Sequence, residues 1–525
     1  MKKYFNTAGP CDPERHYMLP AAQRLGDAQF IIDRGQYFVV HAPRQTGKTT
    51  SLAALAQQLT DEGEYAALHF SCETAEPAGE DYERAEMQIL DVIADTARWR
   101  LPLELQPPTP WPTATPGLRI NFGLSDWVSR CPRPLVLLFD EIDAVRGNSL
   151  HSVLRQLRDG YTIDREGFVH SIVLCGLRDV RDYKAASGDD PSRFGSSSPF
   201  NIKVDSVRIG DFTHDEVATL YTQHTTETGQ QFTSRAIDLA HYYTQGQPWL
   251  VNALAAEVID RMRVETTITD DHIDQAKERL ILARATHLDS LVARLHEPRV
   301  QRVIEPLITG TLPDVDPTFN EDASYVRDLG LIADEKTIRI ANPVYKEVIV
   351  RVLGAGIESV ILAQPSSFRL PDGRLDFPRL LAEFAAFWKQ NGEILTVKQG
   401  YHEAAAQLVL MAYLHRIVNG GGYIDREYGL GRGRIDLLLR QPYTDPDGRR
   451  AWQREALELK VWRDKDPDPL AEGLAQLDGY LDRIDLDTGV LVVFDRRNTA
   501  EPIAERTRFI ETTSPAGRSV TLLRA

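Results

Sequence analysis

Cysteine is scarce in this sequence. Among 525 residues there are four cysteines, Cys11, Cys72, Cys131 and Cys175, and they lie far apart with no CxxC pair. Zinc sites and disulfide frameworks usually show closely spaced cysteines, so the sequence disfavours both.

Long apolar runs and an excess of basic residues are also missing. The longest apolar runs, such as Leu135–Phe139, are far too short to cross a bilayer. The first residues, MKKYFNTAGPCDPERHY, lack the apolar segment of a signal peptide. We therefore expect a cytoplasmic protein with no membrane partner. Asp and Glu outnumber Lys and Arg by 76 to 60, a net charge of −16, so contact with nucleic acid would need a local basic patch.

The composition is that of a globular protein. Apolar residues make up 42% and charged residues 26% of the chain, which excludes disorder along its whole length. A chain of this length predicts three or four domains, and no internal repeat is present.

Short apolar strands alternate with helices over the first 210 residues. Strands are predicted at Tyr37–Val40, Tyr65–Phe70, Leu135–Phe139 and Ser171–Cys175, and helices at Lys48–Leu59, Tyr82–Arg98 and Leu150–Leu157. The proline-rich stretch Leu101–Gly117 is predicted to be an irregular surface loop. This alternation indicates a parallel sheet covered by helices on both faces.

The first strand leads into a phosphate-binding loop. Residues 42–49 read APRQTGKT, a Walker A pattern in which Ala42 stands where the first glycine usually lies. In such a loop, backbone N–H groups cradle phosphates, Lys48 contacts the β- and γ-phosphates, and Thr49 binds Mg²⁺. The predicted nucleotide-contacting residues are Ala42, Pro43, Arg44, Gln45, Thr46, Gly47, Lys48, Thr49 and Thr50.

A Walker B pattern follows at the end of an apolar strand. In the run LVLLFDE, Asp140 would hold Mg²⁺ through water and Glu141 would polarise the attacking water. A buried strand ending in a solvated acidic turn is the alternative, and the Walker A loop upstream argues against it. At the end of the next strand, Arg178 could reach a γ-phosphate or pair with Asp179 at the surface.

The pattern changes after residue 210. Residues 213–284 read as helices, with Thr213 or Thr233 as caps, and Gly246-Gln247-Pro248 opens a helix over Trp249–Met262. Residues 291–353 read as helices followed by a hairpin that turns at Asp334–Lys336, a winged-helix pattern.

These features resemble the AAA-type and STAND-type P-loop ATPases. The resemblance rests on the two Walker motifs, on Arg178, and on the Gly246-Gln247-Pro248 turn, and it covers about Tyr4–Leu353. It implies that Arg178 senses the γ-phosphate and that Pro248 belongs to a lid over ATP. It also implies an ATP-driven switch that is often oligomeric in its active state.

A second constellation of polar residues lies near the C-terminus. Asp436 is expected on the strand Gly433–Leu439, and Glu458 and Lys460 share one face of the next strand, Ala456–Trp462. Asp436 and Glu458 could bind Mg²⁺, for which Mn²⁺ could substitute, while Lys460 orients a water molecule. A following helix presents Gln476 and Tyr480 on one face. Glu403, on a helix predicted at Glu403–His415, could add a further acid to the metal site.

This constellation resembles the PD-(D/E)xK nuclease superfamily, although Ile435 stands in place of the proline of its name. The resemblance implies that Asp436, Glu458, Lys460, Gln476, Tyr480 and Glu403 form a nuclease site. An exposed hairpin with a Glu–Lys ion pair is the alternative. Seven arginines crowd the region and could form a basic patch or simply solvate the hairpin: Arg426, Arg432, Arg434, Arg440, Arg449, Arg450 and Arg454.

The sequence therefore predicts a multidomain α/β protein. Its expected parts are a P-loop ATPase core (1–210), a helical lid (211–290), a winged helix (291–353), a linker (354–373) and a nuclease-like α/β domain (374–525). The leading hypothesis is an ATP-regulated, metal-dependent nuclease that cuts DNA or RNA, with bacterial defence suggested by resemblance alone. The alternatives are an ATP-dependent switch or scaffold whose last domain only binds nucleic acid or protein, and a DNA-remodelling motor.

Overall fold

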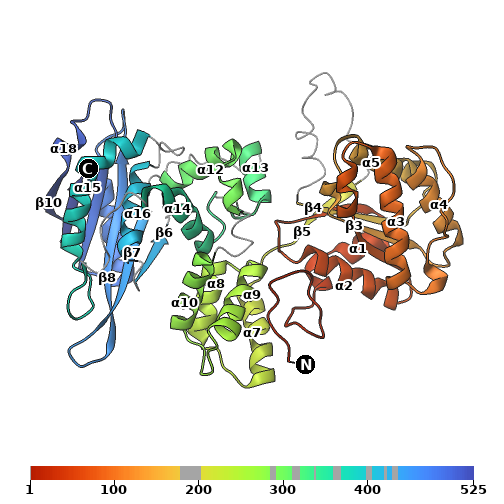
Figure 1. Ribbon diagram of the computed structural model, residues 1–525, viewed down its shortest axis with the longest axis horizontal. Helices are drawn as coiled ribbons and strands as arrows, with labels where there is room; N and C mark the ends of the chain where they lie inside the picture. The colour runs from red at the N-terminus through yellow and green to blue at the C-terminus, as the bar shows by residue number, and fades with distance from the viewer. Residues whose placement is uncertain are drawn as a thin grey trace. The chain divides into compact units, whose positions relative to one another are not determined.

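The computed structural model describes residues 2–177, 203–283, 291–309, 320–335, 338–358, 368–397, 405–418, 422–427 and 435–525. The chain forms two compact units (Figure 1). The first comprises residues 1–282 with 328–330, and the second comprises 283–327 with 331–525.

A five-stranded parallel sheet forms the centre of the first unit. Its strands lie in the order β2-β3-β4-β1-β5. Their bounds are β1 Tyr37–His41, β2 Ala66–Ser71, β3 Leu135–Asp140, β4 Ser171–Gly176 and β5 Lys203–Arg208. The four predicted strands are present. The edge strand β5 was not predicted, because its sequence KVDSVR lacks the continuous apolar run of a strand buried on both faces.

Helices cover both faces of this sheet, as the sequence predicts. On one face, α1 (Ala28–Asp33) and α2 (Lys48–Asp61) pack on strand residues such as Val136 and Leu138. On the other face, α3 (Tyr82–Arg100), α4 (Arg119–Arg130) and α5 (Gly147–Ile163) pack on residues such as Leu137 and Phe139 (Figure 1). Strand residues therefore alternate between two cores.

The proline-rich stretch Leu101–Gly117 is irregular apart from the short 3-10 turn η3 (Leu103–Leu105) and lies mostly at the surface, as predicted, but some of its apolar residues are buried. Leu101 and Leu105 are buried in the core of the first unit. Trp111 packs against the same core, and its Nε1 donates a hydrogen bond to the carbonyl of Leu90 at 3.0 Å. The prediction missed this because apolar residues within the stretch lack a regular period.

A helical subdomain completes the first unit. It consists of α7 (His214–Thr228), α8 (Ser234–Thr244), α9 (Pro248–Ala256), the π-helical turn η6 (Glu257–Arg261) and α10 (Asp270–Leu282). The predicted caps are both confirmed. Thr213 forms a capping box with Glu216, and the Thr233 side chain accepts from the backbone N–H of Ala236. The helix predicted over Trp249–Met262 is thus α9 continued by η6.

The second unit begins with the segment predicted to be a winged helix. Helices α12 (Pro298–Thr309) and α13 (Glu321–Asp328) precede an antiparallel bridge between Ile332 and Ile340. A further helix, α14 (Pro343–Glu358), follows the bridge. The predicted linker 354–373 is therefore wrong at both ends. Residues 354–358 are helical, and Arg369 pairs with Leu375 beside a buried Phe368.

A mixed six-stranded sheet dominates the rest of the second unit, in the order β10-β11-β9-β8-β7-β6. Neighbouring strands are antiparallel, except that β9 runs parallel to both β8 and β11. The elements are α15 Phe377–Val397, α16 Ala405–Val418, β6 Tyr423–Glu427, β7 Ile435–Thr444, β8 Arg450–Trp462, α17 Leu470–Ile484, β9 Thr488–Asp495, α18 Ile503–Arg506, β10 Arg508–Thr513 and β11 Ser519–Arg524.

Helix α14 packs directly on α16. At Gly354 of α14, an added Cβ would lie 3.2 Å from the Cβ of Ala412 on α16, so the two helices approach closely. The winged-helix segment and the C-terminal sheet consequently belong to one compact unit rather than to two domains separated by a linker. Among the residues described, no helix combines the length and the apolar character needed to cross a bilayer.

Gly246 is expected to be indispensable for the turn that precedes α9. Its φ is +78°, and an added Cβ would lie 1.8 Å from the carbonyl oxygen of Phe212. Gly229 makes a matched control, because its φ is +81° but nothing lies within 4 Å of an added Cβ. Gly229→Ala should cost about 1 kcal/mol from backbone strain alone. Gly246→Ala should lower the thermal unfolding midpoint much further, and equal shifts for the two variants would contradict this packing.

Candidate functional site

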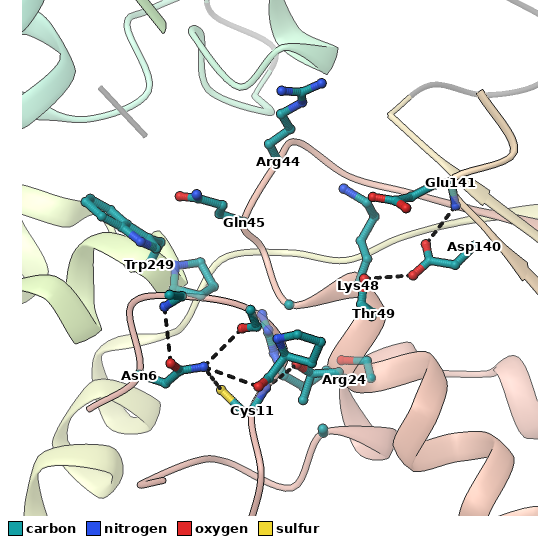
Figure 2. A pocket seen from close by; sticks show the side chains of 18 of the residues that line it. Asn6, Cys11, Arg24, Arg44, Gln45, Lys48, Thr49, Asp140, Glu141 and Trp249 are labelled. Atoms are coloured by element: carbon teal, nitrogen blue, oxygen red, sulfur yellow. Dashed lines mark hydrogen bonds between the residues drawn. The ribbon is translucent and has the colours of Figure 1, made fainter. Parts of the chain in front are cut away.

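A cavity of about 720 Å³ lies at the carboxyl ends of β1 and β3 in the first unit (Figure 2). Ligands of parallel α/β sheets bind at this edge. The walls include the loop between β1 and α2, the ends of β2, β3 and β4, the start of α9, and the N-terminal segment.

The loop between β1 and α2 has a backbone that wraps tightly. Gln45 and Gly47 both have positive φ, +61° and +90°, and the Thr46 hydroxyl donates to the carbonyl of Pro43 at 2.9 Å. Lys48 Nζ donates to the carbonyls of Ala42 and Pro43, both at 2.7 Å. Burial lowers the pKa of Lys48, whereas the nearby carboxylates of Asp140, Asp143 and Glu141 act to raise it. The ammonium group is thus held at the place where phosphate oxygens could replace the loop carbonyls.

Asp140 joins the end of β3 to the start of α2. Its Oδ2 accepts a hydrogen bond from Thr49 Oγ1 at 2.7 Å and lies 3.2 Å from Nε2 of His69 on β2. Burial by itself would raise the pKa of Asp140, but hydrogen bonds from His69, Thr49 and Cys175 hold it below its ordinary value. Asp140 is therefore a carboxylate at neutral pH.

Glu141 occupies a strained position beside Lys48. Its φ is +54°, and its Oε2 accepts a hydrogen bond from the Ser71 hydroxyl at 2.7 Å. Figure 2 shows the Glu141 carboxylate close to the end of the Lys48 side chain. Strained backbone at a carboxylate in a cavity is typical of a functional site.

These side chains fit Mg²⁺ and a nucleotide phosphate. The Thr49 hydroxyl and the Asp140 carboxylate are oxygen donors of the kind Mg²⁺ prefers, and they already lie within hydrogen-bond distance of each other. Bound there, Mg²⁺ would neutralise phosphate charge. With the parallel sheet, the strand-loop-helix unit and the acidic end of β3 in place, the assignment of the fold is clear. The first unit has the fold of a P-loop ATPase.

No family model and no curated protein matches this sequence. Solved structures with a similar fold include the Walker-type ATPase PABY2304 of Pyrococcus abyssi, at 15% identity and a TM-score of 0.45, over 66% of this chain and 99% of that chain. The RuvB Holliday junction branch migration motor of Thermotoga maritima matches at 13% identity and a TM-score of 0.33, over 63% of this chain and 93% of its own. Cdc6p from Pyrobaculum aerophilum has the same identity and TM-score, over 63% and 92%. So distant a similarity assigns no activity.

The helical subdomain reaches the phosphate-binding loop through the Gly246-Gln247-Pro248 turn. Gln247 Nε2 donates to the carbonyl of Gln45 at 3.3 Å, while Gln247 Oε1 caps α9 by accepting from the backbone N–H of Leu250. Pro248 lines the cavity, as do Trp249 and Asn252 from the same helix. The helical subdomain thus contacts the phosphate-binding loop directly, through the residues at the start of α9.

Two residues of the predicted phosphate-binding loop, Arg44 and Thr50, differ from the others in what their side chains contact. Arg44 is exposed on the cavity wall, and Figure 2 shows it extending away from Thr49 and Asp140. The Thr50 hydroxyl accepts a hydrogen bond from the backbone N–H of Cys11 at 3.0 Å, so it anchors another part of the wall.

That wall is the N-terminal segment Asn6–Cys11, which sequence reasoning missed. The Asn6 amide donates to the carbonyls of Gly9 and Pro10, and its Oδ1 accepts from the backbone N–H of Ala8. The segment also contacts α9, because Trp249 Nε1 donates a hydrogen bond to the carbonyl of Thr7 at 2.9 Å. The only signal in the sequence was the turn-forming composition NTAGPC, which names no partner.

Arg24 was missed as well. Its Nη1 donates to the carbonyl of Thr46 at 3.0 Å, and its guanidinium lies 4.5 Å from the ring centroid of Phe212. Burial lowers the pKa of Arg24, and Glu216 and Asp211 act in the opposite direction. The Arg24 side chain therefore links the phosphate-binding loop to Phe212, which lies just before α7. A lone arginine in a helix carries no sequence pattern that would reveal this.

Three predicted positions lie outside the part of the chain that the structure describes. These are Arg178, Glu403 and, for its side chain, Asp436. Leu177, immediately before Arg178, does line the nucleotide cavity.

The second predicted site is centred on Glu458 and Lys460 of β8. Both side chains are buried, with exposed fractions of 0% and 4%, and Lys460 Nζ lies 3.3 Å from Glu458 Oε1. Lys460 also donates to Gln476 Oε1 and lies 3.5 Å from Glu472 Oε1. In the backbone register, Asp436 of β7 pairs with Glu458.

Tyr480 does not share the environment of Gln476. It is buried in the core between α17 and the sheet, together with Leu477 and Leu481, while Gln476 one turn earlier contacts Lys460. Both residues belong to the helix that packs on the face of Glu458 and Lys460, and the hydrogen bond recorded with Lys460 is that of Gln476.

The predicted basic patch is partly engaged in internal contacts. Arg440 donates to Asp425 and lies over the rings of Tyr423 and Trp452. Arg454 donates to the carbonyl of Ile484 at 2.9 Å. Arg432, Arg434 and the side chain of Arg426 lie outside the described structure.

The Asn6 network is expected to support nucleotide affinity. Asn6→Asp keeps the acceptor for Ala8 but removes the amide donors to Gly9 and Pro10, so the segment should loosen from the cavity. Losing one or two such hydrogen bonds, about 1–2 kcal/mol, should weaken binding of a fluorescent ATP analogue about tenfold. Glu14→Gln, at an exposed position three residues beyond this segment, should bind as the wild type does. Equal affinity in the Asn6→Asp protein would show that the segment has no part in binding.

Proposed function

We propose that this protein is an ATP-hydrolysing switch that controls a metal-dependent nuclease in its second unit. The observation that supports the first part best is the convergence of Lys48, Thr49, Asp140 and Glu141 on one cavity. The observation that supports the second is the pairing of Asp436 with a buried Glu458–Lys460 pair on the adjacent strand.

ATP hydrolysis fits the chemistry of the first cavity. Lys48 is placed to neutralise charge on the phosphates, and Thr49 and Asp140 would hold Mg²⁺. Glu141 would orient and polarise the attacking water. In the present conformation its carboxylate accepts from Ser71, so it must leave that hydroxyl, or share it, to act on water.

Nuclease chemistry fits the buried polar pair in the second unit. A glutamate with no exposed surface is costly to keep in an apolar sheet unless cations or hydrogen bonds compensate its charge. Residues paired directly across an antiparallel ladder lie on the same face, so Asp436 and Glu458 could share a metal ion.

The same ladder supports nucleic acid as the substrate. Moving along β8 in steps of two from Glu458 leads to Arg454, Trp452 and Arg450, which therefore occupy the same face. Arg440 and Arg450 lie 5.5 and 5.0 Å from the ring centroid of Trp452. Guanidinium groups and aromatic rings along one face are what a nucleic-acid backbone and its bases would contact.

A binding-only role is the alternative that one observation favours. Lys460 lies 3.3 Å from Glu458 and also contacts Gln476 and Glu472, so a cation already stands beside the buried carboxylate without a metal ion. A domain of this kind could bind nucleic acid without cutting it.

The ATPase proposal predicts different results for two substitutions. Lys48→Ala should abolish tight ATP binding, because the charge that faces the β- and γ-phosphates is lost. Glu141→Gln should retain ATP but lower its hydrolysis by about 100-fold or more, because only the activation of water is removed. Nucleotide binding and phosphate release measure the two effects. Hydrolysis at the wild-type rate by Glu141→Gln would rule out the role assigned to Glu141.

The nuclease proposal predicts that Asp436→Asn, Glu458→Gln and Lys460→Ala each eliminate cleavage and leave ATP hydrolysis intact. The assay should offer duplex and single-stranded DNA and RNA with Mg²⁺, with Mn²⁺ and with a chelator. Glu511→Gln is a matched control, since Glu511 is an exposed carboxylate on β10 of the same sheet. Cleavage that survives the chelator or Asp436→Asn would exclude this metal site. Binding without cleavage by the wild type would favour the alternative role.

The same assay tests regulation when it is run with ATP, with ADP and without nucleotide. The expected result is a cleavage rate that depends on nucleotide in the wild type and no longer does so in Lys48→Ala. A ligand that prefers one of two states by about 3 kcal/mol shifts their ratio by more than a hundredfold. Equal rates under all conditions would leave two independent activities on one chain.

A further inference from the structure

The second unit contains a cavity of about 250 Å³ that the proposed function does not use. It lies where β9 ends, between α15, α16 and α18. The lining residues are Trp388, Glu393, Ala406, Phe494, Asp495, Arg496, Arg497, Ile503, Arg506 and Ala525.

This cavity lies away from the proposed metal site. Lys460 of β8 is in register with Val493 of β9, so these two residues share a face of the sheet. The next residue, Phe494, faces the other side, and its ring contacts Trp388 of α15 at a centroid distance of 5.2 Å. The cavity therefore opens on the α15 side of the sheet, opposite to Glu458 and Lys460.

The inner wall of the cavity carries an unsatisfied hydrogen-bond donor. Trp388 is 2% exposed, and its ring is held between Phe384 and Phe494. Its Nε1 is buried and has no hydrogen-bond partner among the residues that the structure describes. Buried indole N–H groups nearly always have an acceptor, so this one is available to an acceptor that enters the cavity.

Arg506 supplies a second donor of the same kind. Its Nη1 donates a hydrogen bond to the carbonyl of Glu501 at 2.6 Å. Its Nε is buried and has no hydrogen-bond partner in the described structure. Burial lowers the pKa of Arg506, yet a guanidinium stays charged at neutral pH. The group is thus a partly desolvated cation on the cavity wall.

The other charged residues of the cavity are largely balanced against each other. Asp495 accepts from Arg497 at both carboxylate oxygens, at 2.9 and 2.6 Å, and Arg497 also lies over the ring of Trp462. Arg496 adds a cation and Glu393 an anion at exposed positions of the rim. The cavity thus combines a wall that donates hydrogen bonds with a rim on which arginine predominates.

We infer that this cavity binds a phosphate group through Trp388 Nε1 and the Arg506 guanidinium. A tetrahedral oxyanion offers several acceptors at once, so it can satisfy both donors and the arginine charge, which a neutral carbonyl cannot. The volume admits a phosphate together with part of what it is attached to. The group could come from free inorganic phosphate or from the phosphorylated end of a nucleic-acid strand, and the experiment separates these sources.

The test uses the full chain labelled with ¹⁵N-tryptophan. Trp388→Phe keeps the packed ring, removes only the N–H, and so identifies the Trp388 indole signal by its absence. Inorganic phosphate, a 5′-phosphorylated oligonucleotide and the same oligonucleotide with a 5′-hydroxyl are titrated separately. The expected result is a shift of the Trp388 signal with one of the phosphate ligands, and binding at least tenfold weaker in Trp388→Phe and in Arg506→Gln.

Arg508→Gln is the matched control, because it removes the same charge from an exposed position on β10, and it should bind as the wild type does. A response to inorganic phosphate alone would identify free phosphate as the ligand. A response to the phosphorylated but not the hydroxyl oligonucleotide would identify a strand end. The inference is overturned if no phosphate ligand moves the Trp388 signal, or if Arg506→Gln binds as tightly as Arg508→Gln.

Discussion

The hydrogen bond from Thr49 to Asp140 is the interaction on which the first unit depends. It joins residues 91 positions apart in the sequence, at the carboxyl ends of two strands that β4 separates in the sheet. Because the strands are parallel, both chain segments leave the sheet at the same edge, one as a phosphate-binding loop and the other as an acidic turn. The buried carboxylate of Asp140 stays ionised there because Thr49 and His69 supply hydrogen bonds that water no longer can.

Around this centre, the cavity is completed by segments that come from far along the chain. Asn6–Cys11 forms one wall, and the first turn of α9 forms another. Gln247 contacts the backbone of the phosphate-binding loop, and Trp249 contacts the backbone of the N-terminal segment. A rearrangement of the phosphate-binding loop would therefore alter direct contacts with the start of α9.

The second unit has a different constraint, a buried acid beside a buried lysine. Glu458 and Lys460 have almost no exposed surface, and Gln476 and Glu472 of α17 contact the lysine. Helix α14 extends from the winged-helix segment onto α16 of the same unit. Helix α14 therefore joins the segment predicted to be a winged helix to the helices of the C-terminal part of this unit by direct packing.

Local patterns in the sequence determined much of this architecture. The strands β1 to β4 were predictable because parallel strands buried on both faces must be apolar throughout, and the caps Thr213 and Thr233 because each acts within one helical turn. The two Walker motifs and the Glu458–Lys460 pair were likewise visible, since each lies within a few residues.

Only the tertiary structure decided which distant residues complete these sites. Arg24, Ser71, His69 and Asn6 follow no periodic pattern, and their roles arise from strand register and loop packing. Helical spacing placed Gln476 and Tyr480 together, yet only packing against the sheet buried one ring in the core and left the other side chain on Lys460. The start of the expected linker was wrong for the same reason: Gly354 and Gly356 lie within α14, where Gly354 packs closely against Ala412 of α16.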